Sequence, residues 1–452
     1  MMSNPLLLPE LRKLLAEGNE AELREILTEL HPASVADFSE DLSVKETWEL
    51  LGIAPIDQQE EIFTFYPHYK QEQLASGAGR ERMSALLERM SHDDRVDLLK
   101  RLDDEVVESL LPLVAKAERE DIRKLMSYPE HTVGSVMTTD YATLPPDVSV
   151  EEALARIRRQ APAAETIYFV YVVDRQHQLL GVVSLRDLIV AKPVAQVRDL
   201  MQANPISVRA EQDREDVAQE VAKYDLLAIP VVDPQNRMVG IVTHDDVADV
   251  VEKEATEDFH LTAGISPLAK GYVGSGVGLL YNRRIGWLVI LVFVNLVSSG
   301  VIAAYEETLA AAITLAFFLP LLIDSGGNTG AQAATLIIRA LATGEIEFRL
   351  WWRVLVKELM VGLSLGLTMA VASGVLGYFR GGGQIGLIVG LSMFFIVVIT
   401  NLVGVLLPFV LTRLRIDPAV ASSPLITTVA DASGLLIYFT IATRIIDLPT
   451  AT

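Results

Sequence analysis

Asp431 lies in an apolar stretch that runs from about residue 424 to residue 446. A stretch of about 20 apolar residues can cross a bilayer. A carboxylate at the centre of such a helix costs about 2.5–3.5 kcal/mol on insertion scales, and it persists when it faces an ion, a water-filled cavity or a partner. The pattern therefore favours a cation-binding group on a path through a membrane over the alternative, a protonated or paired structural aspartate.

Further carboxylates gather at three places in the more polar part of the chain. The first group is Asp93, Asp94 and Asp97 with Asp103, Asp104 and Glu105; the second is Asp213, Asp216 and Asp225; the third is Asp245, Asp246, Asp249, Glu252, Glu254, Glu257 and Asp258. Asp245, Asp249 and Glu252 share one face of a predicted helix, where like charges repel unless a cation lies between them. Each group has two open interpretations, a cation site and a solvated run of charge.

The charge is divided unevenly along the chain. The 452 residues carry a formal net charge of −21, although 50% of them are hydrophobic. Of the 59 acidic and 38 basic residues, 50 and 28 precede Tyr281, so an acidic soluble part comes before a nearly neutral apolar part. The acidic part disfavours nucleic acid as a partner and favours cations. Because the chain has no cysteine, oxygen ligands and seven histidines remain for any metal.

Two kinds of soluble element would position these carboxylates. Between about residues 6 and 128, apolar residues recur three and four positions apart, a spacing that predicts successive amphipathic helices. An internal repeat with a spacing of 59 residues follows, and it relates Asp174 to Asp233, Gly181 to Gly240 and Asp187 to Asp246. Each copy alternates apolar strands with helices, which predicts an α/β fold.

Five apolar segments long enough for membrane helices follow, at about residues 285–304, 309–341, 354–379, 385–411 and 424–446. The second contains Pro320 and Gly326-Gly-Asn-Thr-Gly330, which predicts a break whose unwound carbonyls face an ion; a structural kink is the alternative. Basic residues such as Arg283, Arg284 and Arg413 place the N-terminus in the cytosol and the C-terminus outside. We expect no cleavable signal peptide, because residues 1–10 lack a basic segment followed by an apolar core.

The repeat resembles a tandem pair of CBS domains over about residues 134–251. The matching segments are Tyr171-Val-Val-Asp174, Leu180-Gly-Val-Val-Ser-Leu-Arg-Asp-Leu188 and Val239-Gly-Ile-Val-Thr-His-Asp-Asp-Val247. The resemblance implies an adenine nucleotide such as ATP in the cleft between the copies. Arg186 and Asp187 would hold it, with Tyr168 and Phe169 beside them. The alternative is a carboxylate that only caps the next helix.

An acidic helical domain, a CBS pair and five spans in this order resemble the MgtE family of magnesium channels and transporters. The most specific segments are Glu165-Thr-Ile-Tyr168, Gly326-Gly-Asn-Thr-Gly330, Asn401-Leu-Val-Gly404 and Asp417-Pro-Ala-Val. The resemblance implies a multidomain chain: an all-α helical array (1–130), an α/β tandem CBS pair (131–252, with copies at about 134–196 and 197–252), a connecting helix (253–280) and a five-span α-helical transmembrane domain (281–452). It also implies a homodimer in the inner cell membrane, with the N-terminus and CBS domains cytoplasmic and the C-terminus external.

By the same resemblance, Mg²⁺ passes through a pore on the dimer axis, and Asp431 is the pore carboxylate. Mg²⁺ would also close the pore by bridging the soluble domains and the connecting helix. The residues implied for these further metal sites are Asp93, Asp97, Asp213, Asp225, Asp246, Asp249, Glu254, Glu257, Asp258 and Asp417. Ala331, Ala333 and Ser423 depart from the family pattern near the pore. Asp324 has two open roles, a pore-mouth cation site and a helix cap.

Three functions follow from these observations. The leading one is import of Mg²⁺ through a pore that cytosolic Mg²⁺ gates. The second keeps the membrane role but carries another divalent cation such as Co²⁺, or exports its ion. The third is a membrane-anchored adenine-nucleotide sensor, which five spans with an embedded carboxylate disfavour. We expect no enzyme, because the chain shows no nucleophile–base constellation and no convincing catalytic metal spacing.

Overall fold

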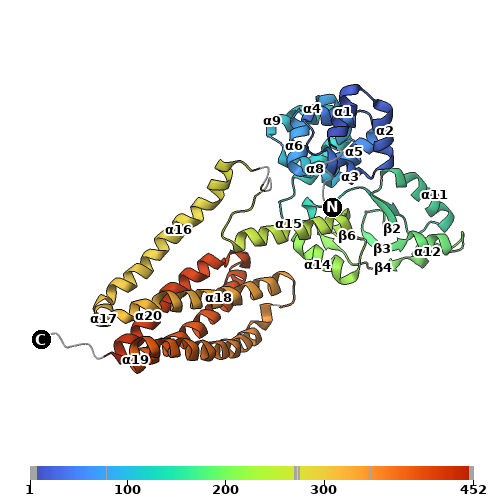
Figure 1. Cartoon of the computed structure of the whole chain (residues 1–452). Coiled ribbons are helices and arrows are strands. Elements are labelled where there is room, and N and C mark those ends of the chain that lie inside the picture. Colours follow the sequence, from blue (N-terminus) through green and yellow to red (C-terminus); the bar gives the residue numbers. More distant parts are fainter. Residues whose placement is uncertain (1–7, 78, 269–271, 273–274, 347, 447–452) are drawn as a thin grey trace. The chain divides into compact units, whose positions relative to one another are not determined.

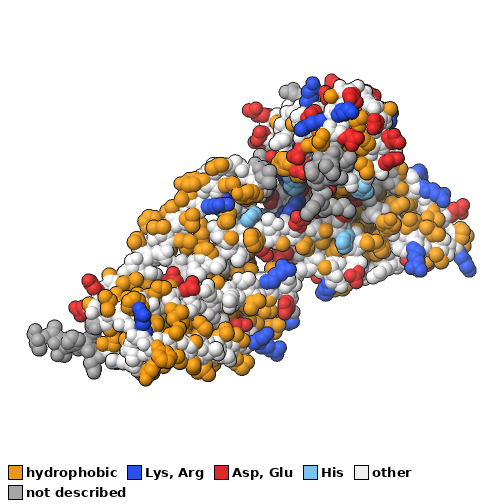
Figure 2. All heavy atoms as spheres, viewed as in Figure 1, with side chains coloured by type: hydrophobic (Ala, Val, Ile, Leu, Met, Phe, Trp, Pro, Cys, Tyr) orange, Lys and Arg blue, Asp and Glu red, His pale blue; other side chains and the backbone are white. Residues whose placement is uncertain are grey.

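The computed structural model describes residues 8–77, 79–268, 272, 275–346 and 348–446 (Figure 1). The chain forms two compact units, Met1–Glu252 and Lys253–Thr452. Charged side chains crowd the N-terminal helices of the first unit, and hydrophobic side chains cover much of the visible surface of the second (Figure 2). This distribution follows the uneven charge of the sequence.

Short helices build the N-terminal part of the first unit. They are α1 (Leu8–Glu17), α2 (Glu20–Glu29), α3 (Pro32–Ser39), α4 (Val44–Leu51), α5 (Ile56–Thr64), α6 (His68–Gly77), α7 (Arg80–Leu87), α8 (His92–Arg101), α9 (Asp104–Leu110) and α10 (Lys116–Met126). Their apolar faces meet in one core that includes Leu23, Phe63 and Leu99. Local signals set their ends, as in α4, where Ser43 and Glu46 form a reciprocal capping box. The predicted helical array is confirmed.

Two α/β copies complete the first unit. The first contains β1 (Tyr141–Leu144), α11 (Val150–Gln160), β2 (Thr166–Val173), β3 (Leu179–Ser184), α12 (Leu185–Val190) and α13 (Val197–Leu200). The second contains β4 (Gln202–Ala203), β5 (Val208–Arg209), α14 (Arg214–Tyr224), β6 (Ala228–Val232), β7 (Met238–Thr243) and the start of α15 (His244–Thr262), a helix that continues past Glu252 into the second unit. The sheets have the orders β1-β2-β3-β4 and β5-β6-β7; in each the first pair is parallel and the remaining neighbours pair antiparallel. The predicted repeat is therefore confirmed.

The two copies exchange their opening segments. β4, from the start of the second copy, pairs with β3 of the first, while Thr138, from the start of the first copy, pairs with Ile241 in β7. Two glycines permit these approaches: a Cβ on Gly181 would lie 2.8 Å from the sulfur of Met201, and a Cβ on Gly240 would lie 2.8 Å from that of Met137. The same glycine–methionine contact therefore occurs twice, with Gly181 against Met201 and Gly240 against Met137.

Long helices build the second unit. They are α16 (Val277–Ala304), α17 (Glu306–Ala311), α18 (Leu319–Ala342), α19 (Trp351–Arg413) and α20 (Ser423–Ile445), with a 3₁₀ segment at Ile313–Phe318. Within the described residues, three helical segments are long and apolar enough to cross a membrane: Val277–Ala304, Phe348–Arg413 and Ser423–Ile445.

The longest of these segments is a helical hairpin. Gly382 inside α19 has φ 79° and ψ −174°, a non-helical conformation that interrupts the helix. The halves then run antiparallel, because a Cβ on Gly374 would lie 3.3 Å from Gly386 O and the Asn401 amide donates to Glu358 O at 2.9 Å. The halves correspond to the third and fourth predicted apolar segments.

The predicted break at Gly326–Gly330 is wrong. Both residues lie inside the continuous helix α18, so their carbonyls are in a helical segment and not in an unwound one. The interruption falls earlier, at Ala312 and the 3₁₀ segment, and Pro320 lies in the first turn of α18, where its missing N–H costs nothing. The glycines serve packing: a Cβ on Gly326 would lie 2.6 Å from Ile396, and one on Gly330 would lie 3.0 Å from Thr400 O.

Replacing Gly404 with alanine is expected to destabilise this helix packing. The added Cβ would overlap the carbonyl oxygen of Gly330, an atom fixed within α18. Overpacking of this kind costs about 1–3 kcal/mol, so we expect the Tm of the full chain in detergent to fall by about 5 °C. Gly300→Ala in α16 is the matched control, because its Cβ would meet nothing within 4 Å. Equal melting temperatures for the two variants would contradict the assigned contact.

Candidate ion-binding sites

Asp431 faces a cavity of about 730 Å³ in the second unit. Helix α20 contributes Asp431 and Thr427 to the lining, the neighbouring helix α18 contributes most of the other residues, and α16 contributes Ile302. The lining residues are Ile302, Leu319, Pro320, Leu321, Ile323, Asp324, Gly327, Thr427 and Asp431. Two carboxylates thus share a recess whose other walls are almost entirely apolar, an arrangement that attracts a cation.

The hydroxyl groups near Asp431 donate hydrogen bonds to backbone carbonyls of their own helix, α20. Thr427 and Thr428 donate to Pro424 O at 3.0 and 2.8 Å, and Ser433 donates to Val429 O at 2.8 Å. Gly434 lies beside another helix, since a Cβ at this position would lie 3.7 Å from the Ile396 side chain. These residues pack α20, while Thr427 alone among them also lines the cavity.

A second carboxylate site joins the helical array to the CBS pair. Asp93 in α8 contacts Asp246 in α15, and Asp246 also accepts a hydrogen bond from the backbone N–H of Thr243 at 3.2 Å. Asp93 Oδ1 is buried and has no hydrogen-bond donor among the described residues. Burial, and next the charge of Asp93, raise the pKa of Asp246 well above its usual range. Two carboxylates held this way require either a shared proton or a cation.

Neighbouring carboxylates extend this site. Burial, followed by the charge of Asp93, raises the pKa of Asp94 to about 7. Desolvation, and then the charges of Asp93 and Asp140, raise the pKa of Glu165 to about 7. Asp97 and Asp249 lie one helical turn beyond Asp93 and Asp246 on their respective helices. The structure therefore brings Asp93 and Asp246 together and places the other two predicted ligands next to them.

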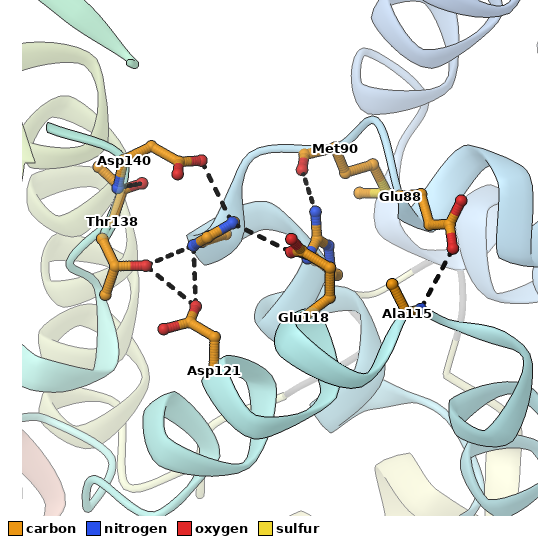
Figure 3. Close-up of polar contacts among 10 residues, drawn as sticks. Glu88, Met90, Ala115, Glu118, Asp121, Thr138 and Asp140 are labelled. Atoms are coloured by element: carbon orange, nitrogen blue, oxygen red, sulfur yellow. Dashed lines mark hydrogen bonds and ion pairs between the residues drawn. The ribbon is translucent and has the colours of Figure 1, made fainter. Parts of the chain in front are cut away.

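Sequence reasoning missed the junction around His92. Its Nδ1 lies 2.8 Å from Asp121 Oδ2, and its Nε2 lies 3.3 Å from both Glu118 Oε2 and Asp140 Oδ2 (Figure 3). Burial alone would lower the pKa of His92, but the hydrogen bond with Asp121 and the charge of Asp140 outweigh burial and raise it. This junction fixes the start of α8, and hence Asp93, against the first CBS copy.

Asp213 and Asp225 do not meet within one protomer. Asp213 is the N-cap of α14 and accepts from the Glu215 N–H at 2.9 Å, whereas Asp225 is the C-cap of the same helix, with φ 50°. An 11-residue helix separates them, a length of about 17 Å. A cation site with both residues in one protomer does not fit this geometry.

A third site lies in the second unit. Burial, and then the charges of Asp417, Glu254 and Glu257, raise the pKa of Asp258 to about 6. Asp417 also accepts a hydrogen bond from the Ala419 N–H at 2.7 Å, at the turn that leads to α20. The four predicted residues of this group are therefore close together. The predicted connecting helix includes the end of α15, while Gly271 and Gly274 of the same segment lie outside the described residues.

The four predicted nucleotide-binding residues lie on adjacent elements of the first CBS copy. Phe169 in β2 pairs in register with Ser184 in β3, and Tyr168 precedes it with 68% of its surface exposed. Arg186 and Asp187 are exposed in the first turn of α12. Asp187 Oδ2 accepts from Ser184 Oγ at 2.6 Å, which is a capping contact. Its remaining acceptor positions are open to solvent, so capping and ligand binding are compatible.

A pair of α/β copies followed by an apolar helical bundle with a carboxylate-lined cavity fits the class of divalent cation transporters. A family profile described as MgtE, divalent cation transporter, matches residues 319–441. The profiles of the MgtE intracellular N domain and the CBS domain match residues 30–131, and 133–193 with 197–253, respectively.

Full-length relatives place the chain in one family. It is 40% identical over 440 residues to the magnesium transporter MgtE of Thermus thermophilus, covering 97% of this chain and 98% of the relative. It is 34% identical over 438 residues to the magnesium transporter MgtE of Bacillus subtilis, covering 96% of each chain. The chain therefore belongs to the MgtE family of magnesium transporters, and these full-length relatives are transporters and not enzymes.

Two solved structures resemble the first unit. One is the soluble part of a magnesium transporter, with a TM-score of 0.52 and 33% identity, covering 55% of this chain and 98% of that chain. The other is the cytosolic domain of the Mg²⁺ channel MgtE in complex with ATP, with a TM-score of 0.51 and 37% identity, covering 54% of this chain and 100% of that chain.

Proposed function

We propose that the chain forms a homodimer that imports Mg²⁺ through a pore on its two-fold axis, with Asp431 as the carboxylate that attracts the ion. The observation that carries this proposal is the position of Asp431 on a cavity within an apolar helical bundle. Mg²⁺ prefers oxygen ligands and loses its water reluctantly, so a hydrated ion needs only carboxylates and a polar path. Two symmetry-related copies of Asp431 would form a charged ring at the axis.

In the proposed topology, five segments cross the inner cell membrane. They are α16, the segment from α17 to α18, the two halves of α19, and α20. The odd number leaves the N-terminus and the CBS pair in the cytosol and the C-terminus outside, in agreement with the basic residues between the segments. The solved relative of the first unit is described as a cytosolic domain, which supports this orientation.

Cytosolic Mg²⁺ gates the pore in this proposal. A cation between Asp93 and Asp246 would satisfy the buried Asp93 Oδ1 and join the helical array to the CBS pair. A second cation at Asp258 and Asp417 would join the end of α15 to the turn before α20. When cytosolic Mg²⁺ falls, repulsion between the uncovered carboxylates would favour an open state, because a ligand stabilises the state that binds it more tightly.

Flux into liposomes tests the transport proposal. The purified full chain is reconstituted, and Mg²⁺ entry is followed with an entrapped indicator while Co²⁺, Ni²⁺ and Ca²⁺ compete. We expect entry well above that of protein-free liposomes, with Mg²⁺ preferred. Stronger transport of Co²⁺ would support the second function instead. ATP binding without any ion flux would support the nucleotide sensor.

We also propose that an adenine nucleotide binds the CBS pair through Asp187, as the ATP complex of the similar cytosolic domain suggests. Asp187→Ala is expected to weaken ATP binding by the full chain about 10-fold, because hydrogen bonds to a charged group contribute about 1.5–3 kcal/mol. Asp199→Ala is the matched control, since Asp199 is an exposed carboxylate in α13. Equal ATP affinity of both variants and the natural protein in calorimetry would leave Asp187 as a helix cap only.

A further inference from the structure

Helix α18 has an exposed polar stripe that the ion path proposed above does not use. Asp324, Asn328, Gln332 and Thr335 follow one another at spacings of four, four and three residues, and all four are exposed in the protomer. The opposite face of the helix is buried and contains Leu322, Gly326, Ala333 and Ile337. Hydrocarbon cannot satisfy a carboxylate and amides. In a membrane this stripe therefore faces water or a second copy of the chain.

The helix register places Asp324 level with Asp431. Helices α18 and α20 run antiparallel: a Cβ on Gly327 would lie 3.1 Å from Thr427, and one on Gly330 would lie 2.9 Å from Ile426. From the Gly327–Thr427 contact, Asp324 is three residues back along α18 and Asp431 is four residues on along α20. Both steps lead the same way, by about 4.5 and 6 Å. The two carboxylates thus lie at nearly the same height, and both line the same cavity.

Asp324 is held in place by its own helix. The Asn328 amide Nδ2 donates to Asp324 Oδ2 at 3.2 Å. This contact orients the carboxylate without neutralising it, because an amide brings no positive charge. Asp324 is the sixth residue of α18, so it is not the N-cap of that helix. Of its two open roles, the cation site is the one that the geometry supports.

We infer that Asp324 is a second ion-capturing carboxylate, paired with Asp431 at one level of the transport path, and that Asn328 positions it. This inference rests on the proposed Mg²⁺ path. In a symmetric dimer the ring would carry four carboxylates in place of two. A ring of higher charge concentrates dications at low external concentration and disfavours monovalent cations relative to divalent ones. Asp324 therefore serves capture and charge selection, while Asp431 is required for passage.

The test measures Mg²⁺ flux against external Mg²⁺ concentration in liposomes that contain the full chain. We expect Asp324→Asn and Asp324→Ser to raise the KM for Mg²⁺ about 10-fold, to leave the maximal flux within about twofold, and to increase Na⁺ inhibition. Asp324→Glu should restore most of the affinity. Asn328→Ala should raise the KM less than removal of the carboxylate does. Glu307→Gln removes an exposed carboxylate from α17 and should change neither constant.

The outcomes separate this inference from the proposed function. An unchanged KM in both neutral variants, together with abolished flux in Asp431→Asn, would overturn the role of Asp324 alone. A loss of maximal flux with an unchanged KM would also overturn it, because that result indicates a structural role. Failure of the natural protein to carry Mg²⁺, or full flux in Asp431→Asn, would instead overturn the proposed path itself.

Discussion

Replacing Asp431 with asparagine is expected to lower Mg²⁺ flux at least about 100-fold at saturating Mg²⁺. A dication 4 Å from one carboxylate is attracted by about 8 kcal/mol at an effective dielectric constant of 20. Loss of a net 3 kcal/mol or so, a small part of that attraction, corresponds to about 100-fold. The substitution keeps the size of the side chain and leaves the cavity in place. Stopped-flow entry of Mg²⁺ into liposomes measures the effect.

The control for this variant is Glu345→Gln, which removes an exposed carboxylate between α18 and α19, outside the cavity. It should retain the flux of the natural protein. Size-exclusion chromatography in detergent should show the same oligomeric state for all three proteins. If Asp431→Asn carries normal flux while it remains folded, Asp431 is a structural aspartate and the path lies elsewhere.

Neutralising the carboxylates between α8 and α15 is expected to leave the transporter open at high cytosolic Mg²⁺. The combined variant Asp93→Asn, Asp97→Asn, Asp246→Asn and Asp249→Asn removes both the repulsion and the ligands that a bridging cation needs. In the natural protein, cytosolic Mg²⁺ at about 10 mM should reduce flux about 10-fold or more, a change of about 1.4 kcal/mol in the gating equilibrium. In the variant, the reduction should disappear. Flux into liposomes with a defined internal Mg²⁺ concentration measures both.

The control for the gating variant is Asp103→Asn with Asp104→Asn, which neutralises exposed carboxylates at the start of α9. Its inhibition by internal Mg²⁺ should match that of the natural protein. Limited proteolysis adds a readout that does not depend on flux: Mg²⁺ should protect the natural full chain and the control, but not the gating variant. Normal closure of the gating variant would show that these residues do not bridge the domains.

The repeat and the two halves of α19 were predictable because the sequence itself shows each pattern: a recurring spacing for the repeat, and two successive apolar segments for α19. Spacings of 59 residues between equivalent aspartates and glycines identify two α/β copies. The break at Gly326–Gly330 was predicted because the second apolar segment is long and contains Pro320 and three glycines, residues of low helix propensity. In the structure, packing overrides that propensity, because Gly330 lets α18 approach Gly404 closely and Gly326 receives Ile396. These partners lie about 70 residues away in the sequence, so no local pattern could show them.

The site around Asp93 was only partly predictable for the same reason. A run of acidic residues marks α8, but it does not show that Asp93 contacts Asp246 in α15. The sequence gives almost no sign of the His92 junction, because the carboxylates that contact His92 come from other elements: Glu118 and Asp121 from α10, and Asp140 from a loop. The lone histidine among carboxylates would have been the one clue.

The exchanged openings of the two CBS copies affect how this part of the chain is made and how it comes apart. During synthesis, the sheet that contains β3 stays incomplete until β4 of the next copy has left the ribosome. Strand β7 is made later still, and it pairs with Thr138, which was synthesised before it. Each CBS copy therefore contributes a segment that pairs with a strand of the other copy. We expect the two copies to unfold in one step, and a single cut between residues 193 and 197 should leave two pieces that stay together until denaturant releases both.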